Sequence, residues 1–210
     1  MAIDRELRTT FDEVARLYDE ARPGYPEELI DDLVSFSEIP PAGHILEIGC
    51  GTGQATLPLA RRGYAMLGLE LGEHLAALAA THCQPYPNVQ IQNLAFEDWP
   101  VQMERFDLVM SASAFDWIPT EIGYPKAAAS LKASGSIALF WHDHIGADTP
   151  FFRATRKLRE QVPELGAAVS PKQPEARLAA IEQQILGSGL FGPPVAKRYP
   201  WSTIYTAERY

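Results

Sequence analysis

The sequence has 210 residues, of which 46% are hydrophobic and 21% charged, and its formal net charge is −9. This length and composition suffice for one globular core and exclude a wholly disordered chain. The negative charge disfavours a sequence-independent interaction with nucleic-acid phosphates. The 2 cysteines are too few for a disulfide framework, and no apolar run reaches the ~20 residues of a transmembrane helix. We therefore expect a soluble, cytoplasmic protein without a membrane partner.

Helices and strands are predicted to alternate along most of the chain. Two N-terminal helices are separated by a break that contains Pro23 and Pro26. From residue 44 onward, short apolar runs typical of strands alternate with helical segments, which predicts an α/β fold with a doubly wound, mostly parallel sheet and helices on both faces. The predicted helices are residues 10–20, 27–36, 54–62, 73–82, 121–132, 151–161 and 175–186, and the predicted extended segments are residues 44–48, 64–70, 89–93, 106–111, 136–141 and 195–205.

A glycine-rich turn follows the first predicted strand. Residues 47–53 read Glu-Ile-Gly-Cys-Gly-Thr-Gly, and a strand, a glycine turn and a helix start in this order let the backbone approach a ligand closely. The dinucleotide pattern G-x-G-x-x-G requires its third glycine where Gln54 or Thr56 stands, and the Gly-Lys-Ser/Thr end of a P-loop is absent. The spacing therefore disfavours both phosphate-binding interpretations. A tight turn without a ligand is the alternative.

An acidic residue, Glu70, ends the next predicted strand. A carboxylate in this place can accept hydrogen bonds from both hydroxyls of a ribose. Dinucleotide-binding folds share this feature, so it indicates a nucleoside-containing cofactor without naming one. The alternative is an ordinary solvated strand end.

Together, residues 47–53 and Glu70 resemble the cofactor site of class I S-adenosylmethionine-dependent methyltransferases. The resemblance extends to residues 18–26, Tyr-Asp-Glu-Ala-Arg-Pro-Gly-Tyr-Pro, which are typical of the small-molecule branch that includes trans-aconitate-type enzymes. It continues through residues 96–100, 106–109 and 134–136 and covers roughly positions 10–141.

This resemblance implies a Rossmann-like methyltransferase fold. Residues 1–40 would form an N-terminal helical lid, and residues 41–210 the S-adenosylmethionine-binding domain, as a single globular unit with the lid. Residues 206–210 read like the first turn of a helix that is then cut off. We therefore expect the carboxyl end to be truncated.

The resemblance also assigns roles to individual residues. Glu47 would orient the turn, whose glycines would pass beneath the methionine and ribose parts of the cofactor. Tyr18 and Arg22 would close over the cofactor, with Arg22 suited to its carboxylate; a packed tyrosine and a surface arginine are the alternative. Glu70 would bind the ribose. The implied cofactor-binding residues are Tyr18, Arg22, Glu47, Gly49, Cys50, Gly51, Gly53, Glu70, Leu71, Phe96, Glu97 and Ser111.

Two positions depart from the family's pattern. Ala95 stands where many relatives have an aspartate, so adenine recognition would fall to the backbone and Glu97, with Leu71 and Phe96 nearby. Asp116 precedes a tryptophan where the trans-aconitate-like branch has His-Trp. A general-base role borrowed from that histidine is therefore not transferable.

Three polar residues are candidates for acid–base chemistry. Asp116 would either orient a substrate hydroxyl or ammonium or cap the following turn. His142 and His144 follow the fifth predicted strand, where they would contact the substrate, transfer a proton or simply be solvated. Their His-x-His spacing also suits a metal, but no third ligand is evident, so we predict no metal site.

The expected reaction is the in-line transfer of a methyl group from S-adenosylmethionine to a small-molecule acceptor. The cofactor carries the reactive group, so the protein would supply proximity, alignment and exclusion of water. The alternatives are a non-catalytic S-adenosylmethionine-binding protein and an NAD(P)-dependent oxidoreductase, which the glycine spacing opposes. Nucleic-acid substrates are disfavoured by the net charge and by residues 111–114, Ser-Ala-Ser-Ala, in place of Asn/Asp-Pro-Pro-Tyr/Phe.

Overall fold

The computed structural model describes residues 10–143, 150–162, 174–203 and 206. The chain divides into two compact units, which are described separately below. One unit comprises residues 1–140 with 197–210, and the other comprises residues 141–196.

The first unit is built on a five-stranded sheet in the order β3-β2-β1-β4-β5, in which every neighbouring pair is parallel. The chain winds outward from β1 through β2 to β3 and then returns to β4 on the other side of β1. The carboxyl ends of β1 and β4 therefore form a topological switch point, the place where open α/β sheets bind ligands. The strands are β1 His44–Ile48, β2 Ala65–Glu70, β3 Val89–Asn93, β4 Phe106–Ala112 and β5 Leu131–Phe140.

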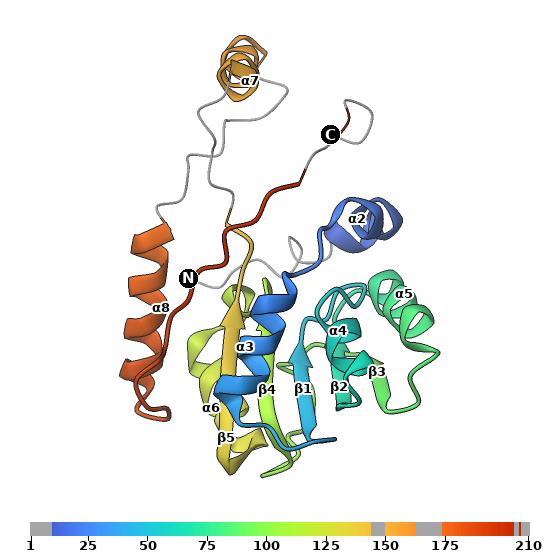
Figure 1. Ribbon diagram of the computed structural model, residues 1–210, viewed down its shortest axis with the longest axis vertical. Coiled ribbons are helices and arrows are strands. Elements are labelled where there is room, and N and C mark those ends of the chain that lie inside the picture. The colour runs from blue at the N-terminus through green and yellow to red at the C-terminus, as the bar shows by residue number, and fades with distance from the viewer. Residues whose placement is uncertain (1–9, 144–149, 163–173, 204–205, 207–210) are drawn as a thin grey trace. The chain divides into compact units, whose positions relative to one another are not determined.

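Helices cover both faces of this sheet, as the alternating pattern predicted. Figure 1 shows α3 and α6 on opposite faces, and α2 beyond the carboxyl ends of β1 and β2, beside the start of α5. The helices of this unit are α2 Ala15–Ala21, α3 Glu27–Ser37, α4 Thr56–Arg61, α5 Glu73–Cys83 and α6 Thr120–Ser130, with a 3-10 turn, η1, at Phe115–Trp117. The fold class is therefore the predicted one.

Several element boundaries differ from the prediction, most of them by one or two residues, and β5 begins at Leu131 where a strand over residues 136–141 was expected. The helix expected over residues 10–20 is interrupted at Val14, between helical residues 10–13 and α2. The helix expected over residues 121–132 is too long by two residues, because Leu131 already pairs with Phe106 in the sheet.

The core explains why the strands are apolar along most of their length. Ile45 of β1 and Met110 of β4 pack with Ile30 and Leu33 of α3, and Leu59 of α4 completes this layer. Strands that are buried on both faces need apolar residues on both. Glu47 of β1, Glu70 of β2 and Ser111 of β4 are buried polar residues within these strands, and Glu47 is 0% exposed.

The segment that returns to the first unit joins α3. Lys197 and Tyr199 both contact Oδ2 of Asp32, at 2.5 and 2.7 Å. Residues 195–203, which were expected to be extended, form neither a helix nor a strand.

The second unit contains α7 Pro150–Gln161 and α8 Pro174–Ser188. Arg177 of α8 pairs with Asp143 at 3.0 Å, and its guanidinium lies 4.7 Å from the ring centre of Trp141. These contacts connect α8 to the start of this unit.

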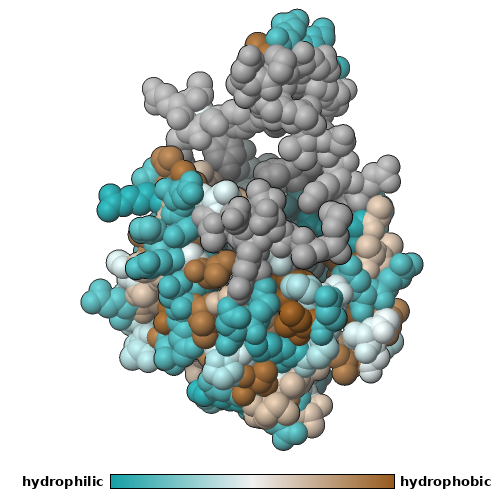
Figure 2. Space-filling model, turned by 180° about the vertical axis from the view of Figure 1, so that it is seen from behind, coloured by the Kyte–Doolittle hydropathy of each residue, from teal (hydrophilic) through white to brown (hydrophobic). Residues whose placement is uncertain are grey.

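The face of the protein that is seen in Figure 2 is mixed in character. In Figure 2, hydrophobic side chains lie singly or in small groups between hydrophilic ones, as is normal for a protein surface. None of the helices in the described part of the chain combines the length and apolar character needed to cross a bilayer.

Candidate functional site

A small pocket lies at the switch point between β1 and β4. Its walls come from the end of β1, the turn after it, the end of β4 and the N-terminal segment, and it encloses about 230 Å³, part of it open to solvent. Several residues proposed from the sequence meet here although they are distant in the chain. The lining residues are Tyr18, Arg22, Tyr25, Glu47, Gly49, Cys50, Gly51, Gln54, Ala55 and Ala112.

The turn after β1 requires glycine for conformation and for space. Gly49 has a φ of +69°, and a Cβ there would lie 2.3 Å from the Cβ of Ala114. Gly51 has a φ of +57°, and its missing Cβ would lie 3.6 Å from the Tyr18 ring. Larger residues would be strained at both positions. Glycine therefore keeps the turn in this conformation, and Gly49 and Gly51 both line the pocket.

Glu47 places a buried carboxyl group in the pocket wall. Its Oε2 accepts a 2.6 Å hydrogen bond from the Thr56 hydroxyl, whereas its Oε1 has no hydrogen-bond partner among the described residues. Burial raises the pKa of Glu47 to about 8, with the charge of Glu70 adding to the effect and the Thr56 bond opposing it. A buried acceptor without a partner is costly. A ligand that donates a hydrogen bond would relieve this cost.

Glu70 ends β2 beneath the same turn. Its Oε2 accepts the Gly51 amide at 2.8 Å, and its Oε1 accepts the Gly72 amide at 2.9 Å. Burial raises the pKa of this carboxyl group in spite of these two backbone hydrogen bonds. Each carboxylate oxygen can accept more than one hydrogen bond, but Glu70 is buried and is not among the residues that line the pocket.

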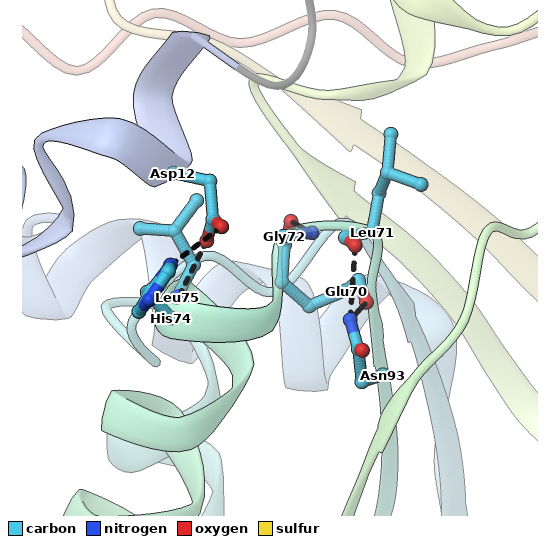
Figure 3. Close-up of polar contacts among 7 residues, drawn as sticks. All are labelled: Asp12, Glu70, Leu71, Gly72, His74, Leu75 and Asn93. Atoms are coloured by element: carbon cyan, nitrogen blue, oxygen red, sulfur yellow. Dashed lines mark hydrogen bonds and ion pairs between the residues drawn. The ribbon is translucent and has the colours of Figure 1, made fainter.

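The backbone beside Glu70 is held by the neighbouring strand. The side-chain amide of Asn93, at the end of β3, donates to the carbonyl oxygens of Glu70 and Leu71 at 3.0 and 2.9 Å. Figure 3 shows both contacts. Leu71 is half-buried at this point.

The loop after β3 is fixed by α6. Phe96 is buried and stacks on Trp99 with ring centres 6.2 Å apart. Lys126 donates to the carbonyl oxygen of Glu97 at 2.8 Å, and its Nζ lies 5.4 Å from the Phe96 ring centre. The loop is thereby tied to the helix that precedes β5.

The N-terminal segment supplies aromatic and cationic groups to the pocket. The Arg22 guanidinium lies 5.7 Å from the Tyr18 ring centre, and the Tyr25 hydroxyl is 3.2 Å from the Ser113 hydroxyl. Burial raises the pKa of both Tyr18 and Tyr25. Both phenols are therefore neutral hydrogen-bonding groups at neutral pH.

The remaining candidates have different positions. Ser111 is fully buried, and its hydroxyl donates to the carbonyl oxygen of Ile48 at 2.8 Å, so it joins β4 to β1. Gly53 belongs to the glycine turn but is not among the lining residues. Asp116 is exposed in η1 and does not line the pocket. His142 belongs to the second unit, and His144 lies outside the described residues.

Sequence reasoning missed several residues of the pocket. Gln54, Ala55 and Ala112 line it without having been proposed, and so does Tyr25, although Tyr25 lies in the segment that the family resemblance highlighted. Thr56 was considered only for the glycine spacing. Within the ranges that the structure covers, no group of three or more His, Cys, Asp or Glu residues is arranged to hold a metal ion.

The sequence and the fold were then compared with known proteins. Residues 45–135 match the family described as "Methyltransferase domain". An uncharacterized methyltransferase of Mycobacterium tuberculosis is 30% identical over 139 residues, which cover 66% of this chain and 54% of that protein. The chain thus spans about half the length of the curated relatives that it matches first.

Solved structures share the fold. A Methanococcus maripaludis protein assigned to the S-adenosylmethionine-dependent methyltransferases aligns with a TM-score of 0.57 and 16% identity, over 90% of this chain and 86% of that one. A phosphoethanolamine N-methyltransferase of Haemonchus contortus, in complex with phosphomonomethylethanolamine and S-adenosylhomocysteine, aligns with a TM-score of 0.58 and 18% identity, over 86% of this chain and 43% of that one. At these identities the likeness is one of fold.

Proposed function

We propose that this chain, whose residues 45–135 match the family described as "Methyltransferase domain", is a class I S-adenosylmethionine-dependent methyltransferase that transfers a methyl group to a small-molecule acceptor. The observation that carries the proposal is the pocket at the switch point. There, Oε1 of buried Glu47, which has no hydrogen-bond partner among the described residues, and the backbone of Gly51 lie within the region that matches the family.

The residues present fit the cofactor of this family. S-adenosylmethionine has an amino-acid end with an ammonium and a carboxylate, and a ribose with two hydroxyls. Glu47 offers an acceptor to the ammonium, and Arg22 suits the carboxylate. Glu70 offers lone pairs to the ribose hydroxyls beside the Gly51 amide.

The chemistry divides between cofactor and chain. When bound, S-adenosylmethionine supplies a methyl group on a positively charged sulfur. The chain supplies position: the glycine turn lets the backbone come close, and Tyr18 and Arg22 in the pocket wall exclude water from the ligand. Proton removal is needed only for some acceptors, and Asp116, His142 and His144 remain the proposed groups for it.

Two features support a small-molecule acceptor of the trans-aconitate-like branch. The net charge of −9 opposes binding to a phosphate backbone. Tyr18, Arg22 and Tyr25, from the segment that resembles this branch, all line the pocket. Asp116 stands where the branch has histidine, so the general-base role of that histidine is not carried over to it.

Calorimetric titration with S-adenosylhomocysteine, and separately with NAD, tests the proposal. We expect the homocysteine nucleoside to bind and NAD to show no binding. A screen of small carboxylic acids, phenols and amines with methyl-labelled cofactor then looks for turnover. Binding of S-adenosylhomocysteine without turnover on any acceptor would favour a non-catalytic binding protein. Binding of NAD alone would contradict the proposed methyltransferase function.

A further inference from the structure

The N-terminal segment, residues 10–21, contacts α5 through an aspartate near its start. Oδ1 of Asp12 accepts the backbone amide of Leu75 at 3.0 Å, and its Oδ2 lies 2.8 Å from Nδ1 of His74. Figure 3 shows Asp12 placed over the first turn of α5 with both contacts. The carboxylate therefore caps a helix that is distant from it in the sequence.

The start of α5 is built to receive this carboxylate. Its N-cap residue, Gly72, has no side chain with which to cap the helix. A Cβ at Gly72 would lie 2.5 Å from Oδ1 of Asp12, so only glycine leaves room. Burial alone would raise the Asp12 pKa, but the hydrogen bonds from Leu75 and His74 outweigh it and the pKa is lowered. A charged carboxylate is also favoured by the helix macrodipole.

A second aspartate fastens the other end of the segment to the glycine turn. Oδ1 of Asp19 accepts the Thr52 hydroxyl at 2.5 Å, and its Oδ2 lies 3.5 Å from Nε2 of His82. The other ring nitrogen of His82 lies 2.8 Å from the Thr52 carbonyl oxygen. Because a carbonyl only accepts, that nitrogen carries the hydrogen. Asp19 and His82 thus hold Thr52 from two sides.

The two contacts repeat one arrangement. Each joins an aspartate of the segment to a histidine of α5. The two aspartates are about two helical turns apart in the sequence, and so are the two histidines. Tyr18, which lies against Gly51, is adjacent in the sequence to Asp19. Arg22 is the first residue after the segment. The segment is thus held at both ends beside the pocket.

We propose that Asp12 and Asp19 are positioning residues for cofactor binding, which hold the N-terminal segment along α5 and so keep Tyr18 and Arg22 at the pocket. The inference rests on the proposed function, because it assumes that the pocket takes the cofactor. Neither aspartate lines the pocket itself. Their effect on a ligand must therefore pass through the residues they position.

The experiment compares Asp12→Ala and Asp19→Ala with the conservative Asp12→Asn and Asp19→Asn. Asp31→Ala is the matched control, since Asp31 also joins two parts of the chain, but does so between α3 and Arg62, the residue after α4, at 2.6 Å. Two quantities are measured on the full chain. One is the Kd of S-adenosylhomocysteine, and the other is the backbone amide hydrogen exchange of residues 10–21 without ligand, where the Tyr18 amide is hydrogen-bonded to the Val14 carbonyl oxygen.

We expect each alanine variant to raise the Kd about tenfold and to speed exchange across residues 10–21. The asparagine variants should restore much of both, because the amide oxygen can still accept the Leu75 amide or the Thr52 hydroxyl. The control should leave the Kd and the exchange of the segment unchanged.

Two results would overturn the inference. One is unchanged exchange of residues 10–21 in both alanine variants, which would mean that the aspartates do not hold the segment. The other is faster exchange with an unchanged Kd, which would mean that the segment does not position cofactor-binding groups. If the wild-type chain binds no S-adenosylhomocysteine, the proposed function fails, and the exchange data alone decide whether the segment is held.

Discussion

The backbone amide of Gly51 donates a 2.8 Å hydrogen bond to Oε2 of Glu70. This contact joins the turn after β1 to the end of β2. The other carboxyl oxygen of Glu70 accepts the amide of Gly72, directly before α5. One buried carboxyl group therefore orients the glycine turn and the start of a helix together.

Replacing this carboxyl group by an amide tests its double role. Glutamine has one accepting oxygen, so in Glu70→Gln either Gly51 or Gly72 loses its partner and faces an NH2 group. We expect the free energy of unfolding to fall by about 1–3 kcal/mol and the affinity for S-adenosylhomocysteine to fall by about tenfold. Urea unfolding and calorimetry measure the two effects. Glu73→Gln, at an exposed neighbouring position, is the control. Wild-type affinity in Glu70→Gln would contradict the assigned role.

Gly51→Ala separates backbone strain from the loss of ligand space. Gly63 has a φ of +86°, and a Cβ at that position would meet nothing within 4 Å, whereas a Cβ at Gly51 would meet Tyr18 and Gln54. Both alanine variants should lose about 1 kcal/mol of stability from the positive φ. Only Gly51→Ala should weaken S-adenosylhomocysteine binding, as calorimetry would show. Equal affinities in the two variants would place the ligand elsewhere.

Much of the fold could be predicted because strands buried on both faces produce short apolar runs. The glycine turn and Glu70 were found for a related reason, since a backbone that must approach a ligand excludes side chains. These signals are local in the sequence. They led to the proposed site residues at the ends of β1 and β2, of which Gly49 and Gly51 line the pocket.

Contacts between distant segments could not be predicted in this way. Nothing near Asp12 in the sequence indicates that it caps α5, because its partner amide belongs to Leu75. The break at Val14 and the early start of β5 at Leu131 likewise depend on tertiary packing and strand pairing. A single sequence indicates the propensity of each segment, but the bounds of a helix or strand also depend on the segments that pack or pair with it.

Glu47 should make stability depend on pH. Its pKa rises from an ordinary 4.5 to about 8 in the folded chain. Below pH 4.5 the carboxyl group is protonated in the folded and the unfolded state, so it adds no pH dependence to the free energy of unfolding. Between these values the unfolded chain ionises while the folded one stays neutral. The stability contributed by the neutral carboxyl group is therefore lost as pH rises, by at most about 1.4 kcal/mol per pH unit, and the loss ends above the folded pKa.

Glu47→Gln removes this titration while keeping an oxygen for the Thr56 hydroxyl. Urea unfolding of both proteins between about pH 5 and pH 9 should show the variant gaining stability relative to wild type as the pH rises. Parallel curves would mean that Glu47 ionises as freely in the folded state as in the unfolded one.

Lys126→Met tests the loop after β3, which the family resemblance assigns to adenine. Methionine keeps the length of the side chain but cannot donate to the Glu97 carbonyl or place a charge near the Phe96 ring. Burial already lowers the Lys126 pKa, so the substitution removes a partly desolvated charge. We expect stability to change by about 1 kcal/mol or less, because the loss of the hydrogen bond and the relief of desolvation oppose each other.

The effect on binding should be confined to the adenosine end of the ligand. The affinities for S-adenosylhomocysteine and for adenosine, both measured by titration, should fall by the same factor, about threefold to tenfold, if Lys126 acts only through residues 96 and 97. Lys132→Met is the matched control, since Lys132 pairs with Asp107 at 2.7 Å, away from this loop. Weaker binding of S-adenosylhomocysteine with unchanged binding of adenosine would contradict this prediction, because Lys126 would then act on the amino-acid end of the ligand. Lys126 is not among the residues that line the pocket.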